Sequence, residues 1–343
     1  MEDMLDYIRK YPEMVLDAIE ATKRAHIPVL KFDRVVVCGM GGSAVGGDFI
    51  VDTLRAYGIR LHAEVSRRYE LPTHVGKGTL IIISSYSGET EETLSQFAEA
   101  RRRGLQVICM SSGGRLKKWA ENFGIPFVEL PGGFKPRATL PYSLFTVIEY
   151  LREAGKLDLT ADIDEAVQVL TDLRNDRGKD NEMMSLAGLM SNNRICVYGS
   201  EAHEAATRRM KNQINENGKL PASWDVFPEM NHNEIVGFED NDLNKENYVI
   251  ILRDPGEHPA VRARIEATKN IIRGKVMGVA EIWTVGKSAL AKDMSLAFMG
   301  DLLSCYLAMH GKKNVDKTAN IDSLKAALRE ELNLQEKIEK ELI

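Results

Sequence analysis

Short apolar runs that are typical of β-strands alternate with helix-like segments along most of the chain. In the first half the clearest strand-like runs are RVVVC, TLIIISS and LQVICM, at residues 34–38, 79–85 and 105–110. Strands that alternate with helices in this way pair in parallel, and right-handed crossovers put helices on both faces of the sheet. The pattern therefore predicts an α/β fold built on a doubly wound parallel sheet.

The second half of the chain repeats the plan of the first. The run NRICVYG at residues 193–199 aligns with DRVVVCG at residues 33–39, and a later alignment places Gly256 opposite Gly88. Two copies of one α/β unit would account for the length of 343 residues. We therefore predict two flavodoxin-like α/β/α sandwiches, an N-terminal domain over residues 1–155 and a C-terminal domain over residues 156–343. The alternating charge of residues 323–343 predicts a packed surface helix at the end.

Charge and cysteine content limit the kind of partner and the compartment. The net charge is −5 and no long run of Lys or Arg occurs, so we expect a small partner and neither nucleic acid nor membrane. The amino terminus lacks a signal-peptide pattern, and no segment is apolar for long enough to span a bilayer. The scattered cysteines are typical of buried thiols in a reducing compartment, and we expect a cytoplasmic protein: Cys38, Cys109, Cys196 and Cys305.

A glycine-rich stretch, CGMGGSAVGGDF at residues 38–49, follows the first predicted strand and precedes a helix-like segment. A strand, a glycine-rich turn and a helix together point backbone N–H groups at an anion. Gly39-x-Gly41-x-x-Ala44 also matches a loose dinucleotide fingerprint, with Glu64 where a ribose ligand would lie. A P-loop is excluded because Gly46 is not followed by Lys and Ser or Thr. Taken alone, the stretch would indicate a tight turn that lets a helix pack close to the sheet.

A second turn, SYSGET at residues 85–90, follows the next long strand. Parallel topology brings both turns to the carboxyl edge of the sheet, where open α/β folds bind ligands. Ser and Thr hydroxyls and the free N–H groups of a helix can hold a phosphate monoester without a fixed charge. The alternative is an ordinary N-cap at Ser87 with first-turn acids at Glu91 and Glu92. The corresponding turn of the second half has lost most of the hydroxyls, so we expect an anion only in the first domain.

The stretches GMGGSAVGGD, SSYSGETEET, NQINENGK and NHNE, taken in this order, resemble the sugar isomerase (SIS) domain family. More narrowly, they resemble the archaeal and bacterial bifunctional phosphoglucose/phosphomannose isomerases. The resemblance runs over nearly the whole chain. It implies two doubly wound SIS subdomains and a homodimer with active sites at the subunit interface.

The resemblance also implies roles for individual residues. The arginine of the family's PRA motif matches Arg137, its glutamate base Glu216, its ring-opening histidine His232 and its C-terminal catalytic lysine Lys325. Thr318 falls where the family carries a threonine associated with acceptance of mannose as well as glucose. The resemblance further implies that the two turns bind the sugar phosphate, through Gly41, Gly42, Ser43, Ser85, Ser87 and Thr90.

Two positions depart from the family pattern. The hydroxyl-rich turn has Glu89 where Asn is common, and TLPY replaces the more usual ALGY after the PRA motif. The first change would be harmless if Glu89 faced solvent, and the second touches the surroundings of Arg137.

Aldose–ketose isomerisation needs residue types of these kinds. Ring opening uses a group that exchanges protons near neutral pH, such as His232. One carboxylate, such as Glu216, can move a proton between adjacent carbons, and Arg137 can stabilise the enediolate. Each could instead be ordinary: a solvated glutamate, a turn histidine, a surface lysine at Lys325, and His203 either a helix-start residue or a minor member of the site.

The leading hypothesis is a cofactor-free isomerase that interconverts glucose 6-phosphate and mannose 6-phosphate with fructose 6-phosphate through a cis-enediol. Metal chemistry is not expected, since the seven histidines form no H-x-H or H-E-x-x-H pattern. The alternatives are a non-catalytic sugar-phosphate-binding regulator, an NAD-dependent oxidoreductase, and an amino-sugar isomerase or synthase.

Overall fold

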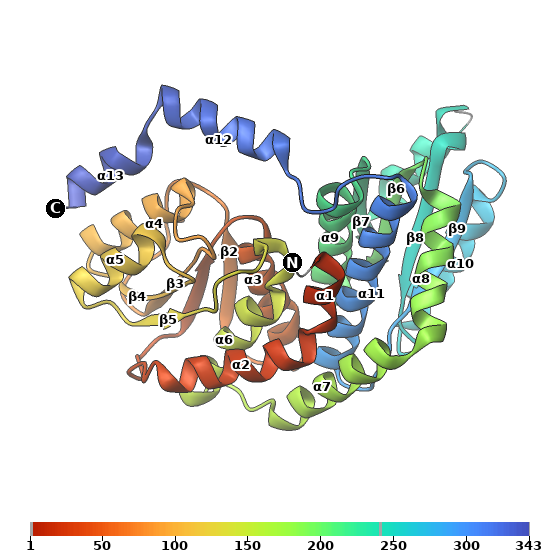
Figure 1. The fold of residues 1–343 in the computed structure, drawn as a ribbon. Helices are drawn as coiled ribbons and strands as arrows, with labels where there is room; N and C mark the ends of the chain where they lie inside the picture. Colours follow the sequence, from red (N-terminus) through yellow and green to blue (C-terminus); the bar gives the residue numbers. More distant parts are fainter. Residues whose placement is uncertain (1–2, 240–241, 343) are drawn as a thin grey trace. The chain divides into compact units, whose positions relative to one another are not determined.

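Each half of the chain forms its own parallel sheet in the computed structural model, which describes residues 3–239 and 242–342 (Figure 1). The first sheet has the order β2-β1-β3-β4-β5, and the second has the order β7-β6-β8-β9. Every described strand pair is parallel. The predicted doubly wound α/β fold is therefore confirmed, and the first sheet comprises β1 (Arg34–Cys38), β2 (His62–Ser66), β3 (Thr79–Ser84), β4 (Gln106–Ser111) and β5 (Phe127–Glu129).

Helices cover both faces of the first sheet. On one face, apolar side chains of β1, β3 and β4 share a core with Phe97 and Trp119 from two of the covering helices. On the other face, α6 packs its Val147 and Tyr150 near Ile82 and Ile108. The helices of this half are α2 (Tyr11–Arg24), α3 (Gly41–Ala56), α4 (Glu91–Arg102), α5 (Gly114–Phe123) and α6 (Leu140–Glu153).

The second sheet is built in the same way. Helix α10 covers one face through Ile265 and Ile272, while α9 and α11 lie on the other face (Figure 1). Helix α11 also packs against α7 and α8. The elements are α7 (Thr160–Asn175), α8 (Arg177–Met190), β6 (Arg194–Ser200), α9 (Glu204–Gln213), β7 (Ala222–Phe227), β8 (Asn247–Arg253), α10 (Pro259–Ile272), β9 (Gly278–Trp283) and α11 (Ala289–His310).

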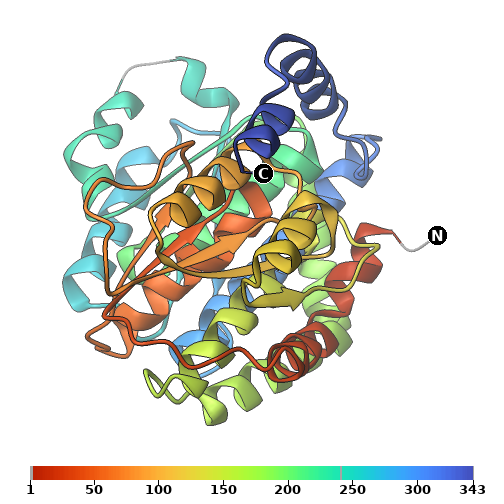
Figure 2. The same ribbon diagram turned by 90° about the vertical axis from the view of Figure 1, so that its left-hand side faces the viewer.

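Each terminal segment of the chain belongs to the compact unit formed by the other half of the chain. The first unit comprises Glu13–Leu159 with residues 318–342, and the second comprises residues 3–12 with Thr160–Lys317. The sequence interpretation divided the chain once, after residue 155. In the structure, α1 (Met4–Arg9) packs on α11 of the second unit, and α13 (Leu334–Leu342) packs on α4 of the first (Figure 2).

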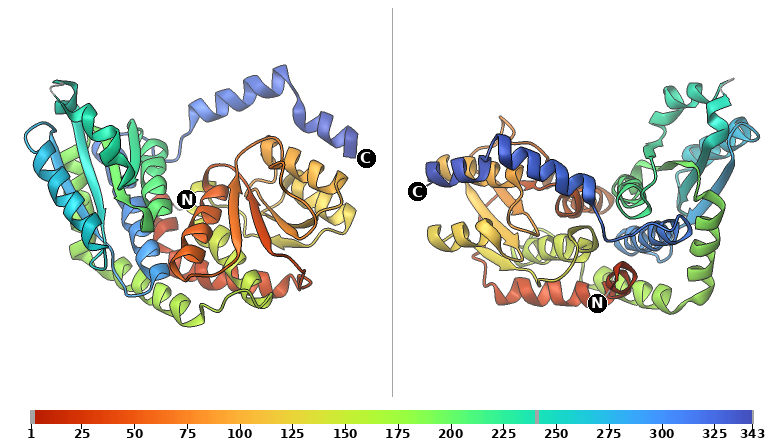
Figure 3. Two further views of the ribbon diagram at one scale, coloured as in Figure 1. Left: turned by 180° about the vertical axis from the view of Figure 1, so that it is seen from behind. Right: turned by 45° about the horizontal axis from the view of Figure 1, so that its top comes forward.

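The C-terminal segment is two helices and not the single packed helix that was predicted. Helix α12 (Ala319–Glu331) ends just before Asn333, whose φ of +43° interrupts the helix before α13 begins. Ile338 and Leu342 of α13 enter the core of the first unit, whereas α12 contains no buried residue and stands clear of its unit (Figure 3). Charge alternation is therefore common to both helices, but of the two only α13 packs an apolar face against the core of the first unit. The last residue of the predicted helix, 343, lies outside the described residues.

Two further sequence predictions concern the cysteines and membrane-spanning segments. All four cysteines are buried and unpaired with one another, as predicted for thiols. Within residues 3–239 and 242–342, none of the helices combines the length and the apolarity that a membrane span requires.

Replacement of Ile338 should test the docking of α13. We expect Ile338→Ala to lower the free energy of unfolding by about 2–5 kcal/mol, because a buried aliphatic side chain would leave a cavity. Leu324→Ala is the matched control, since Leu324 on α12 is 60 % exposed. Urea unfolding of both variants measures the difference, and equal effects would contradict the docking.

Candidate active site

The two predicted phosphate turns of the first unit are in direct contact. They follow β1 and β3, which are neighbouring parallel strands, so both turns lie at the carboxyl edge of the sheet. The backbone N–H of Tyr86 donates a hydrogen bond of 3.0 Å to Ser43 Oγ, and Ser84 Oγ donates one of 3.1 Å to the carbonyl of Ser43. The structure therefore joins the glycine-rich turn to the hydroxyl-rich turn through Ser43.

The glycine at position 42 lets a third segment approach. A Cβ atom there would lie 2.4 Å from the carbonyl oxygen of Pro136 and 2.9 Å from the Cα of Arg137. The 3₁₀ turn Pro136–Ala138 thus packs backbone to backbone on the start of α3, at Gly42. Arg137 is buried in this turn, and the close approach brings its backbone beside the glycine-rich turn.

Hydroxyl groups and a helix N-terminus gather at the second turn. Ser85 is fully buried and donates a hydrogen bond of 3.0 Å to Thr90 Oγ1, while Ser87 is exposed. Thr90 is the N-cap of α4, and its side chain makes no capping hydrogen bond. The first N–H groups of a helix have no partner within that helix, so this turn offers uncharged donors to an anion.

Gly88 is required for the shape of this turn. Its φ is +67°, and a Cβ atom would lie 1.9 Å from the carbonyl oxygen of Gly113. The turn is too tight to admit a side chain at this position. Glycine therefore allows the hydroxyl groups of the turn to lie near the start of α4.

The departure at Glu89 has a structural explanation. Its carboxylate forms an ion pair with the Arg115 side chain and accepts a hydrogen bond of 2.8 Å from the Arg115 backbone N–H. From α13, Gln335 Nε2 donates a hydrogen bond of 2.6 Å to the carbonyl of Glu89. The acid is therefore neutralised by α5 and is held by contacts with α5 and α13.

Tyr86 is a site residue that sequence reasoning missed. Its hydroxyl donates to the carbonyl of Pro131 at 2.8 Å and accepts from the N–H of Phe134 at 2.9 Å, so it holds the loop that leads to Arg137. The backbone N–H of Tyr86 donates its hydrogen bond to Ser43 Oγ. One residue thus ties all three segments together, and the single aromatic residue in a hydroxyl-rich turn was the available signal.

In the second unit, the corresponding turn is occupied by the protein's own charges. Asp254 directly follows β8, and its carboxylate accepts hydrogen bonds from Gly256 N–H at 2.7 Å, from Lys292 Nζ at 3.0 Å and from His203 Nε2 at 3.2 Å. The other ring nitrogen of His203 lies 2.6 Å from Asp293 Oδ1. In the alignment of the two halves, His203 and Asp254 stand opposite Ser43 and Tyr86.

The charges of this cluster determine the pKa of both partners. Burial alone would lower the pKa of His203, but the negative charge of Asp293 and hydrogen bonds to both carboxylates raise it to about 10. Burial would raise the pKa of Asp254, but hydrogen bonds from His203, Gly256 and Lys292 lower it well below its usual range. The pair is therefore ionised at neutral pH.

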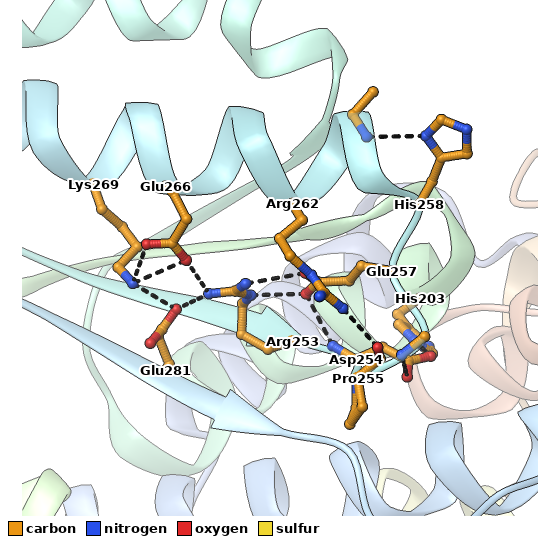
Figure 4. Close-up of polar contacts among 12 residues, drawn as sticks. His203, Arg253, Asp254, Pro255, Glu257, His258, Arg262, Glu266, Lys269 and Glu281 are labelled. Carbon is orange, nitrogen blue, oxygen red and sulfur yellow. Dashed lines mark hydrogen bonds and ion pairs between the residues drawn. The ribbon is translucent and has the colours of Figure 1, made fainter.

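Arg253, the last residue of β8, is likewise neutralised internally (Figure 4). Its buried guanidinium contacts the carboxylates of Glu257, Glu266 and Glu281. Glu257 also accepts a hydrogen bond of 3.0 Å from the Asp254 N–H, and the N-cap His258 accepts one of 3.2 Å from Ala260 N–H. Backbone N–H groups at this turn of the second unit are thus bonded to the unit's own side chains.

Glu216 and His232 belong to the second unit and lie at opposite edges of its sheet. Glu216 is half-buried in the π turn Ile214–Gly218, before β7, and His232 is exposed in the 3₁₀ turn Glu229–His232, after β7. Strand β7, which lies between them in the chain, has six residues and spans roughly 17 Å at about 3.3 Å per residue. The structure therefore does not bring these two residues together within one chain.

Thr318 and Lys325 lie in the first unit. Thr318 is the half-buried N-cap of α12, and Lys325 is exposed on that helix. The structure does not place either residue on the phosphate turns. Among residues 3–239 and 242–342, no group of three His, Cys, Asp or Glu side chains could hold a metal ion.

Two doubly wound parallel sheets, the first with a hydroxyl-lined turn at its carboxyl edge, define an α/β protein built of two such units. The C-terminal domain of glucosamine-fructose-6-phosphate aminotransferase from Francisella tularensis has the same fold, with a TM-score of 0.71 at 15 % identity over 92 % of this chain and 98 % of that one. A model of the bacterial phospho-glucose isomerase C-terminal SIS domain matches residues 179–328.

Curated relatives narrow this class to a family. A bifunctional phosphoglucose/phosphomannose isomerase from Caldicellulosiruptor bescii is 37 % identical over 95 % of this chain and 99 % of its own length. One from Aquifex aeolicus is 34 % identical over 81 % of this chain and 84 % of its own length. The chain belongs to the bifunctional phosphoglucose/phosphomannose isomerase family, as the sequence motifs predicted.

The His203 cluster predicts an alkaline loss of stability. Because the folded-state pKa of about 10 lies above the ordinary 6.5, the contribution is complete below pH 6.5 and is lost as pH rises to 10. His203→Gln should remove this slope and cost about 3–5 kcal/mol at pH 6, since the buried Asp293 loses its cation and Asp254 keeps only Lys292 as a cation. Unfolding free energies of both proteins at pH 6–10 measure it, and parallel pH curves would contradict the assignment.

Proposed function

We propose that this protein interconverts glucose 6-phosphate and mannose 6-phosphate with fructose 6-phosphate, by ring opening and a cis-enediol proton transfer. Membership of the family supports this activity. The observation that carries it is the junction of two phosphate turns with Arg137, made by Ser43, Gly42 and Tyr86 in the first unit. The proposal requires uncharged phosphate donors beside one buried cation, and Arg137 is that cation.

The substrate phosphate binds the uncharged donors of the two turns. Its negative charge is favoured by the N-terminus of α4 and by hydroxyl groups, which need no charged partner. The residues we assign to this role are Gly41, Gly42, Ser43, Ser85, Ser87 and Thr90. Thr318 faces the C2 hydroxyl and allows both epimers to react.

The chemical steps fall to four side chains. His232 opens the sugar ring, because an imidazole can give and take a proton near neutral pH. Lys325 is assigned to the catalytic residues as well. Glu216 then moves the proton between C2 and C1. Arg137 supplies a fixed positive charge where the enediolate develops its negative charge. No step requires a nucleotide, a metal or another cofactor.

We further propose that the active protein is a cytoplasmic homodimer with each active site shared between two copies. The observation behind this is the separation of Glu216 from His232 by the length of β7. One chain cannot present both residues to one sugar, whereas a second copy can supply His232. A non-catalytic regulator is disfavoured, because sugar-phosphate binding alone requires neither Glu216 nor His232.

The purified protein should form fructose 6-phosphate from glucose 6-phosphate and from mannose 6-phosphate, with EDTA present and no nucleotide added. Glu216→Gln should lower kcat by roughly 10²–10⁴-fold, because the proton between C1 and C2 would lose its carrier. The carboxamide has the same shape, so calorimetric binding of fructose 6-phosphate should persist.

Two outcomes would contradict the proposal in different ways. Binding without turnover by the wild-type protein would support the regulator hypothesis. Turnover that survives in Glu216→Gln would leave the activity intact and remove Glu216 as the base.

Mixing two inactive variants tests the shared site. After Glu216→Gln and His232→Ala proteins are unfolded and refolded together, hybrid dimers should regain activity, because one of their two sites holds both wild-type residues. About a quarter of wild-type activity is expected at equal amounts, since half of the dimers are hybrids with one intact site. Each variant refolded alone is the control, and no recovery in verified hybrids would rule out the shared site.

A further inference from the structure

Glu216 sits in a π turn that changes which side of its helix it faces. In an uninterrupted α-helix, residues seven apart lie on the same face, so Glu216 would share the face of Arg209. Arg209 contacts Asp301 of α11 through two hydrogen bonds, of 3.1 Å to Oδ1 and 2.6 Å to Oδ2. The π turn adds one residue to the turn, and Asn217 is buried instead while Glu216 is half-buried.

A row of buried polar contacts holds this register against α11. Gln213, just before the turn, donates a hydrogen bond of 2.9 Å to Asp301 Oδ1. Within the turn, Asn217 Nδ2 donates one of 3.0 Å to Ser304 Oγ, and Ser304 Oγ donates one of 2.7 Å to the carbonyl of Asp301. The contacts therefore lie on both sides of Glu216 along the chain.

The same row extends to the amino-terminal segment of this unit. The Tyr11 hydroxyl hydrogen-bonds Asp301 and accepts a hydrogen bond of 2.9 Å from Arg209 Nη2. Arg209, Asp301, Gln213 and Ser304 are all buried, so no water competes for these contacts. A slip of the π turn along α11 would break these buried hydrogen bonds, which makes the register of the π turn specific.

We propose that Asn217 and Ser304 are positioning residues that aim the Glu216 carboxylate at the substrate. This inference rests on the proposed function, because it takes Glu216 as the base. The Asn217 amide and the Ser304 hydroxyl fix the π turn on α11, and Glu216 is the residue immediately before Asn217. Neither side chain needs to contact the sugar.

A double-mutant cycle on Asn217→Ala and Ser304→Ala tests the proposal through the isomerisation of fructose 6-phosphate. Each single variant should lower kcat about 10- to 100-fold, the size of effect expected from a misplaced catalytic group, while KM stays within about twofold. The double variant should be no slower than the slower single variant, because both changes remove one shared hydrogen bond. Asn212→Ala, on the same helix and outside this row, is the matched control and should keep the wild-type kcat.

Other results would overturn the inference. Melting temperatures that fall while kcat stays within twofold of wild type would show a purely structural role, and losses in kcat that multiply in the double variant would show two independent effects. If Asn217→Ala does not fold, the milder Ser304→Ala is tested alone. A fall in its kcat with an unchanged KM would support the proposal, and an unchanged kcat would contradict it. An inactive wild-type protein, or an active Glu216→Gln, would instead overturn the proposed function and this inference with it.

Discussion

Every described strand runs parallel to its neighbours, and this single constraint decides which residues can meet. Parallel strands end at one edge of a sheet, so the turns after β1 and β3 meet there, and the Tyr86 N–H reaches Ser43. The same constraint keeps Glu216 and His232 apart, because one precedes β7 and the other follows it. Sheet polarity thus assembles the proposed phosphate site in one unit and separates the proposed acid–base residues in the other.

The corresponding turns of the two units differ in which groups are bonded to their donors. In the first unit, the donors at the start of α4 are hydroxyl groups and backbone N–H groups, and the N-cap Thr90 makes no capping hydrogen bond. In the second, Asp254 receives a backbone N–H, a lysine and a histidine, and three glutamates surround Arg253. The Asp254 carboxylate is covalently part of the chain and already bonds these donors. A free anion would have to displace this carboxylate from them. Figure 4 shows the hydrogen bonds and ion pairs that Arg253 and its neighbours make at this turn.

Buried polar contacts in the second unit favour specificity over stability. A buried ion pair such as Arg209–Asp301 adds little net stability, because desolvation of both charges opposes their attraction. An unpaired buried amide costs about 1–3 kcal/mol, so a slipped register of α9 on α11 would be penalised at Gln213 and Asn217. Apolar side chains would tolerate such a slip. We infer that this row of contacts is retained to define the geometry around Glu216.

The sequence by itself determined the α/β class, the duplication, the two turns and the family, because strand alternation, glycine spacing and motif order are local properties of the chain. Only the tertiary structure decided the exchange of terminal segments, the role of Tyr86 and the internal neutralisation of Arg253. Those features depend on contacts between residues far apart in sequence, such as Tyr11 with Asp301 and Gln335 with Glu89. The charge pattern that suggested one packed C-terminal helix was equally present in α12 and α13, and burial against the core distinguished them.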